Sequence, residues 1–176
     1  MGGVVEVRAQ GVPPGFGSYA TREERLDGRL GGALMGIQAV KGVEIGDGFA
    51  LAQQRGSTAH DEIVRGAQGL RRETNRAGGV EAGVSNGEEI VVRAAMKPLP
   101  TLMQPLRTVD LATGEPAEAL VERSDTAAVE ALAVVAEAVV AFELARAARE
   151  KFGGDALRDF VAAHRAYLER IDWHSH

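Results

Sequence analysis

The sequence contains no cysteine, which excludes disulfides, thiolate metal ligands and a thiol nucleophile. It also has no excess of basic charge, because its formal net charge is −5 and its pI is near 5.4. An acidic chain of this kind argues against nucleic acid or an anionic membrane surface as the main partner. We therefore expect a protein that binds neither, and the lack of cysteine is compatible with a reducing cytoplasm.

Lysine is scarce as well, since Lys41, Lys97 and Lys151 are the only lysines among 20 basic residues. In a chain that prefers arginine, a retained lysine suggests a need for a compact point charge. No signal peptide is recognisable, because Met1 leads into two glycines and then a strand-like run. The 176 residues, 45% hydrophobic and 26% charged, are typical of one soluble globular domain.

The most apolar stretch covers 126–148, where the charged residues are few: Glu130, Glu137, Glu143 and Arg146. A helix with so little polar surface is expected to be buried on most sides. The embedded carboxylates argue against a membrane span, because they would be costly in lipid. Gly153 and Gly154 can end this helix.

Three polar residues, Arg123, Ser124 and Asp125, open this helix. Ser124 or Asp125 can cap its free N–H groups. The N-terminus of a buried helix carries partial positive charge. With arginine and serine beside it, this end is also a suitable place to hold an anion. The spacing alone leaves two interpretations, a well-capped core helix and an anion site.

Periodic apolar residues predict the other elements, and turn residues punctuate them. A helix is expected from Leu26 to Ile37, with capping-box spacing at Thr21 and Glu24. Asp155 is suited to cap a last helix that continues through Leu168. Strands are expected over 4–8, over 40–51 as one bent or two short strands, and over 79–84, 88–96, 108–111 and 117–122.

Two hairpins are predicted among these strands, with Asn86-Gly87 and Thr113-Gly114 as their turns. Because strands and helices come in runs, we predict an α+β fold with a mainly antiparallel sheet. Residues 55–77 are polar without clear periodicity, so they form either a functional loop or a poorly ordered one. The tail 173–176 is expected to be loose.

Two weaker patterns have simpler explanations. The sequence GVSNG at 83–87 matches the nucleophile elbow of hydrolases, with Asp125 and His164 following in the appropriate order. That motif requires a helix after the turn, whereas a strand follows here, so a hairpin turn explains Ser85 better.

His60-Asp61-Glu62 suggests a metal, but adjacent residues rarely converge on one ion. We interpret them as a solvated polar loop and predict no metal site.

Lys97 stands between a predicted strand and two prolines. The prolines fix the backbone, so Lys97 and the hydroxyl of Thr101 lose little entropy on binding a ligand. A rigid surface corner would give the same pattern. Together with Arg123, Ser124 and Asp125, Lys97 suggests a pocket for an anionic ligand that contains one well-placed carboxylate.

Several ordered motifs resemble those of chorismate synthases from Gly2 to about Asp155. They are GVPPGFGS (11–18), IQAVKGVEIGDGF (37–49), RGSTAHDE (55–62), TNRAGG (74–79), SNG (85–87), MKPLPTL (96–102) and ERSD (122–125). The resemblance implies buried helices sandwiched between mainly antiparallel sheets. It divides the chain into an incomplete family domain, 1–155, and a C-terminal helix and tail, 156–176.

The resemblance also implies an activity. Chorismate synthases are cytoplasmic homotetramers that convert 5-enolpyruvylshikimate 3-phosphate to chorismate and phosphate, an anti-1,4 elimination in the shikimate pathway to aromatic amino acids. They require reduced FMN without net redox change. By resemblance, Arg123 holds the substrate, and the flavin contacts Gln38, Ala39, Lys97, Thr101, Ser124 and Asp125. Asp125 matches the aspartate proposed to accept a proton through the flavin ring.

The chain resembles only the C-terminal portion of that family. The family's N-terminal half carries two catalytic histidines and most substrate-binding arginines, and no histidine precedes His60 here. Smaller departures are Ala82, Glu89 and Glu130, where the family has glycine, proline and proline. We therefore expect little activity from the chain alone. The alternative is a noncatalytic flavin- or anion-binding module, or an assembly fragment that works only with an N-terminal half.

Overall fold

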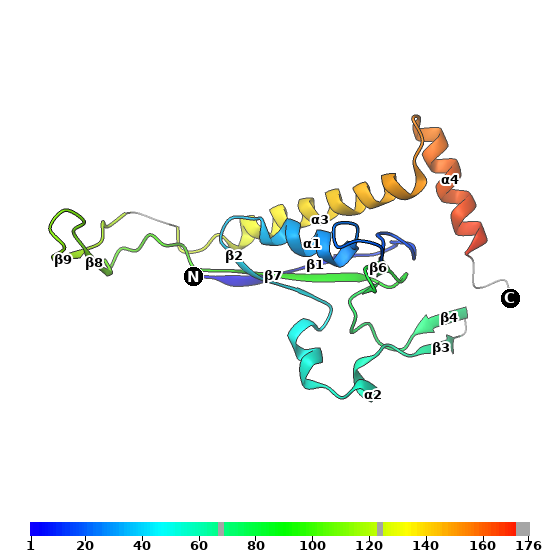
Figure 1. Ribbon diagram of the computed structural model, residues 1–176, viewed down its shortest axis with the longest axis horizontal. Helices are drawn as coiled ribbons and strands as arrows, with labels where there is room; N and C mark the ends of the chain where they lie inside the picture. Colours follow the sequence, from blue (N-terminus) through cyan, green and yellow to red (C-terminus); the bar gives the residue numbers. More distant parts are fainter. Residues whose placement is uncertain (67–68, 123–124, 172–176) are drawn as a thin grey trace.

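A computed structural model describes residues 1–66, 69–122 and 125–171. Its centre is a three-stranded antiparallel sheet of order β1-β7-β2, and helices α1 and α3 lie side by side on one face of that sheet (Figure 1). The predicted α+β class with antiparallel strands is therefore confirmed. Over the described residues this sheet covers one side of the helix layer, which corresponds to an incomplete sandwich.

The central strand is β7 (Ile90–Met96), which pairs on one side with β1 (Gly3–Ala9) and on the other with β2 (Val40–Ile45). Alternation in β1 turns Val5 toward the helices and leaves Val4 on the opposite, exposed face. Four residues of β7 are buried, as expected of a central strand: Ile90, Val91, Val92 and Ala94. The predicted strand at 4–8 is confirmed.

The expected strand over 40–51 is wrong beyond Ile45, because the chain turns there into a short 3-10 helix, Gly48–Gln53. Gly46 has a φ of 59° and lies against the backbone of a distant segment. A Cβ at Gly46 would stand 2.1 Å from the carbonyl oxygen of Arg76. Only glycine allows this close approach, which ends the strand.

The hydrophobic core lies between the helices and the sheet. Helix α1 (Leu26–Met35) contributes three leucines with no exposed area, Leu26, Leu30 and Leu34. Helix α3 (Val129–Phe152) contributes the fully or almost fully buried Leu132, Ala136, Val140 and Ala147. The i, i+4 spacing of the leucines brings them to one face of α1, as their pattern predicted.

The predicted helix caps differ from the observed ones. Ala128, and not Asp125, is the N-cap residue of α3 and has no side-chain cap hydrogen bond, and Ser124 lies outside the described residues. The Oγ of Thr21 accepts from the Glu24 N–H at 3.3 Å, but this closes a turn before α1 starts. The predicted stop at Gly153 is confirmed, because its φ is 60° and its N–H donates to the Arg149 carbonyl.

Helix α3 is buried on one side only, which corrects the expectation of burial on most sides. Val134 and Phe142 are 68% and 69% exposed, and Val135 is 44% exposed. The sheet and α1 cover the opposite side of α3. The apolar character of α3 therefore exceeds what the described part of the chain can bury.

A buried ion pair joins the two helices. The Arg29 guanidinium of α1 donates to Glu143 at 3.1 Å and to Glu150 at 2.6 Å, both on α3. The side chains of Arg29 and Glu143 are only 6% and 12% exposed. A pair this far from water tolerates the loss of Arg29 poorly, because the buried Glu143 then keeps only the 3.9 Å contact with Arg146.

We expect Arg29→Ala to lower the free energy of unfolding by about 3 kcal/mol, because it leaves the buried Glu143 with only the weaker contact of Arg146 at 3.9 Å. The matched control is Arg22→Ala, which removes an exposed pair with Glu23 and should cost less than about 1 kcal/mol. Urea unfolding followed by circular dichroism measures both. Equal losses in the two variants would contradict the assigned role of Arg29.

The turn of the first predicted hairpin lies four residues earlier than expected. Strands β5 (Val80–Glu81) and β6 (Val84–Ser85) pair through Ala82 and Gly83, which have φ values of 52° and 84°. Two consecutive positive φ values define the type I′ turn. Asn86-Gly87 instead connects β6 to β7, and the Oδ1 of Asn86 accepts from the Glu88 N–H. The predicted hairpin between 79–84 and 88–96 is therefore wrong.

Because Ala82 holds a left-handed conformation that its Cβ disfavours, we expect Ala82→Gly to stabilise the protein by about 0.5–1 kcal/mol. Ala82→Val should destabilise it, since a β-branched residue tolerates this φ even less well. Thermal unfolding of the two variants and the parent tests whether glycine raises the stability and valine lowers it. A stabilising valine would contradict the turn assignment.

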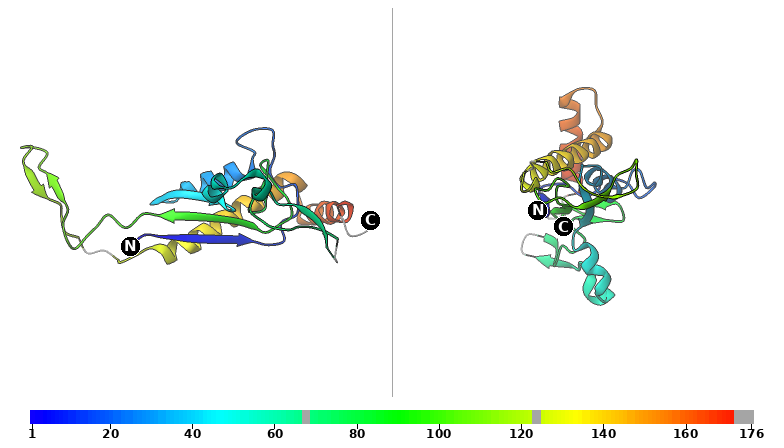
Figure 2. Two further views of the ribbon diagram at one scale, coloured as in Figure 1. Left: turned by 90° about the horizontal axis from the view of Figure 1, so that it is seen from below. Right: turned by 90° about the vertical axis from the view of Figure 1, so that its left-hand side faces the viewer.

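The remaining elements lie outside this core. Helix α2 (Gly56–Ala59) and the paired strands β3 (Ile63–Gly66) and β4 (Gly69–Arg72) lie in the polar stretch 55–77, so the described part of this stretch is structured. Strands β8 (Arg107–Val109) and β9 (Pro116–Glu118) form the second predicted hairpin, which is confirmed. Figure 2 shows that this hairpin lies far from the sheet and the helices.

The last helix is α4 (Leu157–Arg170), as predicted, but Ala156 and not Asp155 is its N-cap. It packs through an aromatic cluster centred on Phe152, which has edge contacts with Phe16, Phe160, His164 and Tyr167. The hydroxyl of Tyr167 donates to the Pro14 carbonyl at 2.6 Å. Among the described residues, no helix is both long and apolar enough to cross a membrane.

Candidate functional site

Two of the predicted flavin-contacting segments meet at one end of the sheet. Lys97 directly follows β7, and its backbone N–H donates to the Ala39 carbonyl at 2.9 Å. Val40 pairs with Met96, so the register of β2 on β7 brings Gln38 and Ala39 beside Lys97. The side chains of Gln38 and Lys97 are exposed, so a cation and an amide are available to a ligand at this end.

Ala39 has an unusual backbone conformation. Its φ is 69°, and among the described residues only Ala39 and Ala82 combine a side chain with positive φ. Such conformations cost about 1–3 kcal/mol and persist where the surroundings impose them, often at ligand sites. At Ala39 the hydrogen bond from Lys97 and the start of β2 impose it.

The start of α3 lies at the same end of the sheet. Gly3 opposes Met96, and a Cβ at Gly3 would stand 2.8 Å from the Val129 side chain. The amino group of Met1 donates to the Thr126 carbonyl. These contacts place Asp125, whose side chain is exposed, at the end of the sheet where Lys97 leaves it.

The structure thus places four of the predicted site residues at the same end of the sheet: Gln38, Ala39, Lys97 and Asp125. Thr101 is half-buried and lies four residues beyond Lys97, where the chain leaves the sheet. Arg123 and Ser124 lie outside the described residues. The described side chains form an open ledge, since none of the three polar ones, Gln38, Lys97 and Asp125, is buried. A ledge of this kind binds a ligand on one side only.

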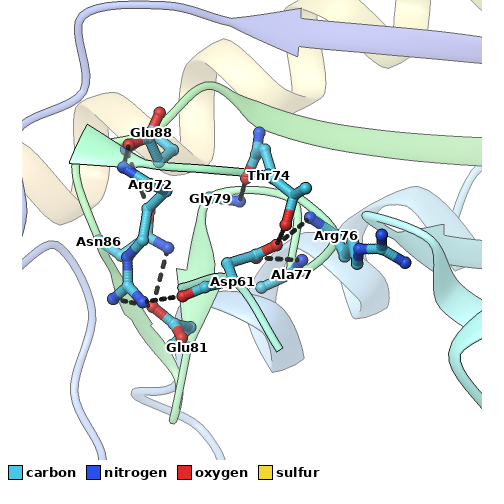
Figure 3. A network of polar contacts seen from close by, with 10 residues as sticks. Asp61, Arg72, Thr74, Arg76, Ala77, Gly79, Glu81, Asn86 and Glu88 are labelled. Carbon is cyan, nitrogen blue, oxygen red and sulfur yellow. Dashed lines mark hydrogen bonds and ion pairs between the residues drawn. The ribbon is translucent and has the colours of Figure 1, made fainter. Parts of the chain in front are cut away.

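A second polar cluster lies away from this ledge, between the β3–β4 hairpin and β7 (Figure 3). Asp61 is only 6% exposed, and its carboxylate accepts hydrogen bonds from the Thr74 hydroxyl at 2.5 Å and from the backbone N–H groups of Arg76 and Ala77 at 2.8 and 2.9 Å. The expected solvated loop is therefore wrong at Asp61. His60 and Glu62 are exposed, and no group of three possible metal ligands occurs among the described residues.

Arg72 connects Asp61 to the turns around β5 and β6. Its guanidinium donates to the Asp61 carbonyl at 2.8 Å and to Glu81 at 2.5 Å, while its backbone N–H donates to Glu88 at 3.1 Å. Asn86 donates to the same Glu81 carboxylate at 2.9 Å. Sequence spacing gave no signal for this network, because its members come from four separate segments.

The network borders a cavity of about 340 Å³. Its lining combines polar and apolar residues: Pro14, Ile63, Leu70, Arg71, Arg72, Asn86, Gly87 and Glu88. Arg72 is engaged by Glu81, so the cavity has no strong excess of positive charge. We interpret the Asp61 network as the support that holds residues 61–77 against Gly46 and β7.

The pKa of Asp61 is lowered. Burial alone would raise it, but hydrogen bonds from Thr74, Ala77 and Arg76 and the charge of Arg72 stabilise the ionised form more. A carboxyl whose pKa is lower in the folded state adds stability above its unfolded pKa, near 3.9. That contribution is lost as the pH falls through the lower folded value.

We therefore expect Asp61→Asn to reduce the free energy of unfolding by about 2–3 kcal/mol at pH 7, because three donors lose a charged acceptor. The loss should shrink as the pH falls below 4, where the parent also loses its carboxylate. Asp110→Asn is the control, since the pKa of Asp110 is lowered in an exposed hairpin turn by Thr113 and Ala112 N–H groups. A pH-independent difference for Asp61→Asn would contradict this account.

Ser85 is a structural residue. It is 3% exposed, its hydroxyl donates to the Pro13 carbonyl at 2.7 Å, and the same oxygen accepts from the Phe16 N–H at 2.8 Å. A strand follows it after a short connection. The structure therefore contradicts the nucleophile-elbow interpretation and explains the SNG motif as the anchor of the proline-containing turn.

Comparisons with known proteins show the family to which this chain belongs. The family model described as chorismate synthase matches residues 1–148. The chain belongs to the chorismate synthase family. A chorismate synthase of Desulforudis audaxviator is 62% identical over 172 residues, and one of Thermobifida fusca is 58% identical over 171 residues. Each alignment covers 97% of this chain and 44% of the relative.

A crystal structure of a chorismate synthase has the same fold. It superposes with a TM-score of 0.80 at 42% sequence identity, and the match covers 97% of this chain and 44% of that chain. The chain therefore spans less than half the length of the chorismate synthases it matches, which is consistent with a C-terminal portion. The uncovered face of α3 and the open ledge are both consistent with this partial coverage.

Proposed function

We propose that this chain supplies one wall of a chorismate synthase active site, which converts 5-enolpyruvylshikimate 3-phosphate to chorismate and phosphate with reduced FMN. The observation that carries the proposal is the hydrogen bond from Lys97 N–H to Ala39, which joins two family motifs at one end of the sheet. Asp125, the last residue of the motif ERSD, precedes α3 at the same end. Family membership supports the class of reaction, a carbon–oxygen lyase.

The residues fit a flavin and an anionic substrate. Gln38, Ala39, Lys97, Thr101 and Ser124 would hold the FMN, and the exposed Lys97 and Gln38 offer a cation and an amide to its polar atoms. Reduced FMN, when bound, supplies electron density to the reacting substrate. Arg123 would bind the phosphate or carboxylate through charge-assisted hydrogen bonds.

The elimination breaks a C–H bond and the C–O bond to phosphate in a 1,4 relation and forms a C=C bond. It needs an acceptor for the proton and stabilisation of the departing anion. We assign Asp125 as the final proton acceptor, since a carboxylate at the helix end carries suitable charge. Arg123 and Lys97 would stabilise the anionic groups.

The isolated chain is expected to have little or no activity. Its ledge is open, and it spans 44% of the length of its relatives. We propose that 1–155 completes a family domain with further polypeptide, with 156–176 as a C-terminal helix and tail, and that the assembled enzyme is a cytoplasmic homotetramer. The second candidate is a noncatalytic flavin- or anion-binding module or an assembly fragment, which the exposed face of α3 favours.

Anaerobic titration with reduced FMN tests the site. If the chain binds flavin, Lys97→Ala should weaken binding at least about tenfold through the loss of a charged contact. The control Lys41→Ala removes another exposed lysine and should leave binding unchanged. Binding that is unaffected by Lys97→Ala would contradict the site.

An activity assay separates the candidates. Chorismate formation only after addition of the N-terminal half of a relative supports a split enzyme. Tight flavin binding without activity in either case supports the noncatalytic module. Full chorismate formation by the isolated chain with reduced FMN would contradict the expected inactivity.

A further inference from the structure

Two consecutive glycines, Gly2 and Gly3, lie at the end of the sheet that carries the candidate site. Gly2 contacts the corner 96–98, where the chain leaves β7, and Gly3 contacts the start of α3. Figure 2 shows the N-terminus beside the tip of β7 and the first turn of α3. The two glycines therefore separate the segment that carries Lys97 from the segment that carries Asp125.

Gly2 is closed in by backbone and ring atoms. A Cβ at Gly2 would stand 2.5 Å from the carbonyl oxygen of Met96, 3.0 Å from the Cδ of Pro98 and 3.1 Å from its nitrogen. None of these atoms can rotate away, because they belong to the main chain or to the proline ring. An alanine at Gly2 would therefore force β1 and the corner 96–98 apart.

Gly3 is closed in by a stiff side chain. It opposes Met96 in the ladder of β1 on β7, which fixes its position. A Cβ at Gly3 would stand 2.8 and 3.1 Å from the two γ carbons of Val129, the first residue of α3, whereas carbon atoms pack best at roughly 3.5–4.0 Å. Because valine has one strongly preferred rotamer in a helix, the clash would be relieved by movement of the helix start.

The segments on both sides of the glycines are held against them. On one side, the Lys97 N–H donates to the Ala39 carbonyl at 2.9 Å, which ties the corner to β2. On the other side, the amino group of Met1 donates to the carbonyl of Thr126, the residue after Asp125. The width of the two glycine residues thus determines how far Lys97 stands from Asp125.

We propose that Gly2 and Gly3 are positioning residues that set the separation of Lys97 and Asp125 for one shared ligand. This inference rests on the proposed function, in which both residues contact the flavin. The glycines act through the two segments that they separate. Groups that bind one ligand need to be held within about 0.5 Å of the productive geometry, and a Cβ at either glycine disturbs this spacing.

Heteronuclear NMR of the isotope-labelled full chain tests the spacing without flavin. Gly3→Ala should shift the amide signals of Asp125 and Thr126, because the start of α3 moves. Gly2→Ala should shift the amide signal of Lys97, because the corner moves. If these signals keep their positions in both variants, the glycines do not set the spacing and the proposal is overturned, whatever the flavin titration shows.

The matched control is Gly32→Ala in α1, where an added Cβ meets no atom within 4 Å. It should leave the signals of both segments in place. Where Gly3→Ala does not fold, Val129→Ile enlarges the same contact by a smaller step and should shift the same signals in its place.

Anaerobic titration with reduced FMN measures the effect on binding, at a temperature where circular dichroism shows each variant to be folded. Gly3→Ala should weaken binding at least about fivefold, because small displacements of binding groups are costly. Adding Val129→Ala removes the two γ carbons that the new Cβ meets, so the double variant should bind within about twofold of Val129→Ala alone. Gly32→Ala should bind like the parent.

The titration also separates this inference from the proposed function. If Lys97→Ala weakens binding but Gly3→Ala only lowers the stability, the positioning role is overturned and the proposed site stands. The same holds if Val129→Ala fails to rescue Gly3→Ala. If the parent chain binds no flavin, that result counts against the proposed site, and the NMR comparison decides the spacing role by itself.

Discussion

Burial of the leucines of α1 and α3 against the β1-β7-β2 sheet is the interaction on which the other features of this protein depend. Leu26, Leu30 and Leu34 have no exposed area, and Leu132 has almost none. The Arg29–Glu143 pair fixes the two helices relative to each other at the edge of this core. Because β7 is the central strand, this core also determines where Lys97 emerges, and with it the end of the sheet that carries the candidate site.

The exposed apolar face of α3 and the open candidate site have the same origin. Helix α3 has more apolar surface than the described residues cover, and the candidate site has one wall. A chain that spans 44% of its relatives necessarily lacks many of their contacts. Exposed apolar residues also occur in segment 98–122, which extends away from the core (Figure 2).

Local chemistry predicted much of the fold. Alternation identified β1, helical spacing identified α1, an apolar run identified α3, and ordered motifs identified the family. The errors follow from contacts that no local pattern contains. Asn86-Gly87 has good turn chemistry, but Ala82-Gly83 forms the turn, because Ser85 is bound to the Pro13–Phe16 segment. Asp61 looked solvated, yet it faces inward because Thr74, Arg76 and Ala77 supply donors from thirteen to sixteen residues away.

The sequence by itself determined the family, the class of fold and the helices, since these depend on residue types and their spacing, and through the family resemblance it predicted the candidate site residues. Only the tertiary structure decided which segments meet. The register of β2 on β7 brings Ala39 to Lys97, and the contact of Gly3 with Val129 brings Asp125 to the same end. Burial also belongs to the tertiary structure, because the exposure of α3 depends on which surfaces are present to cover it.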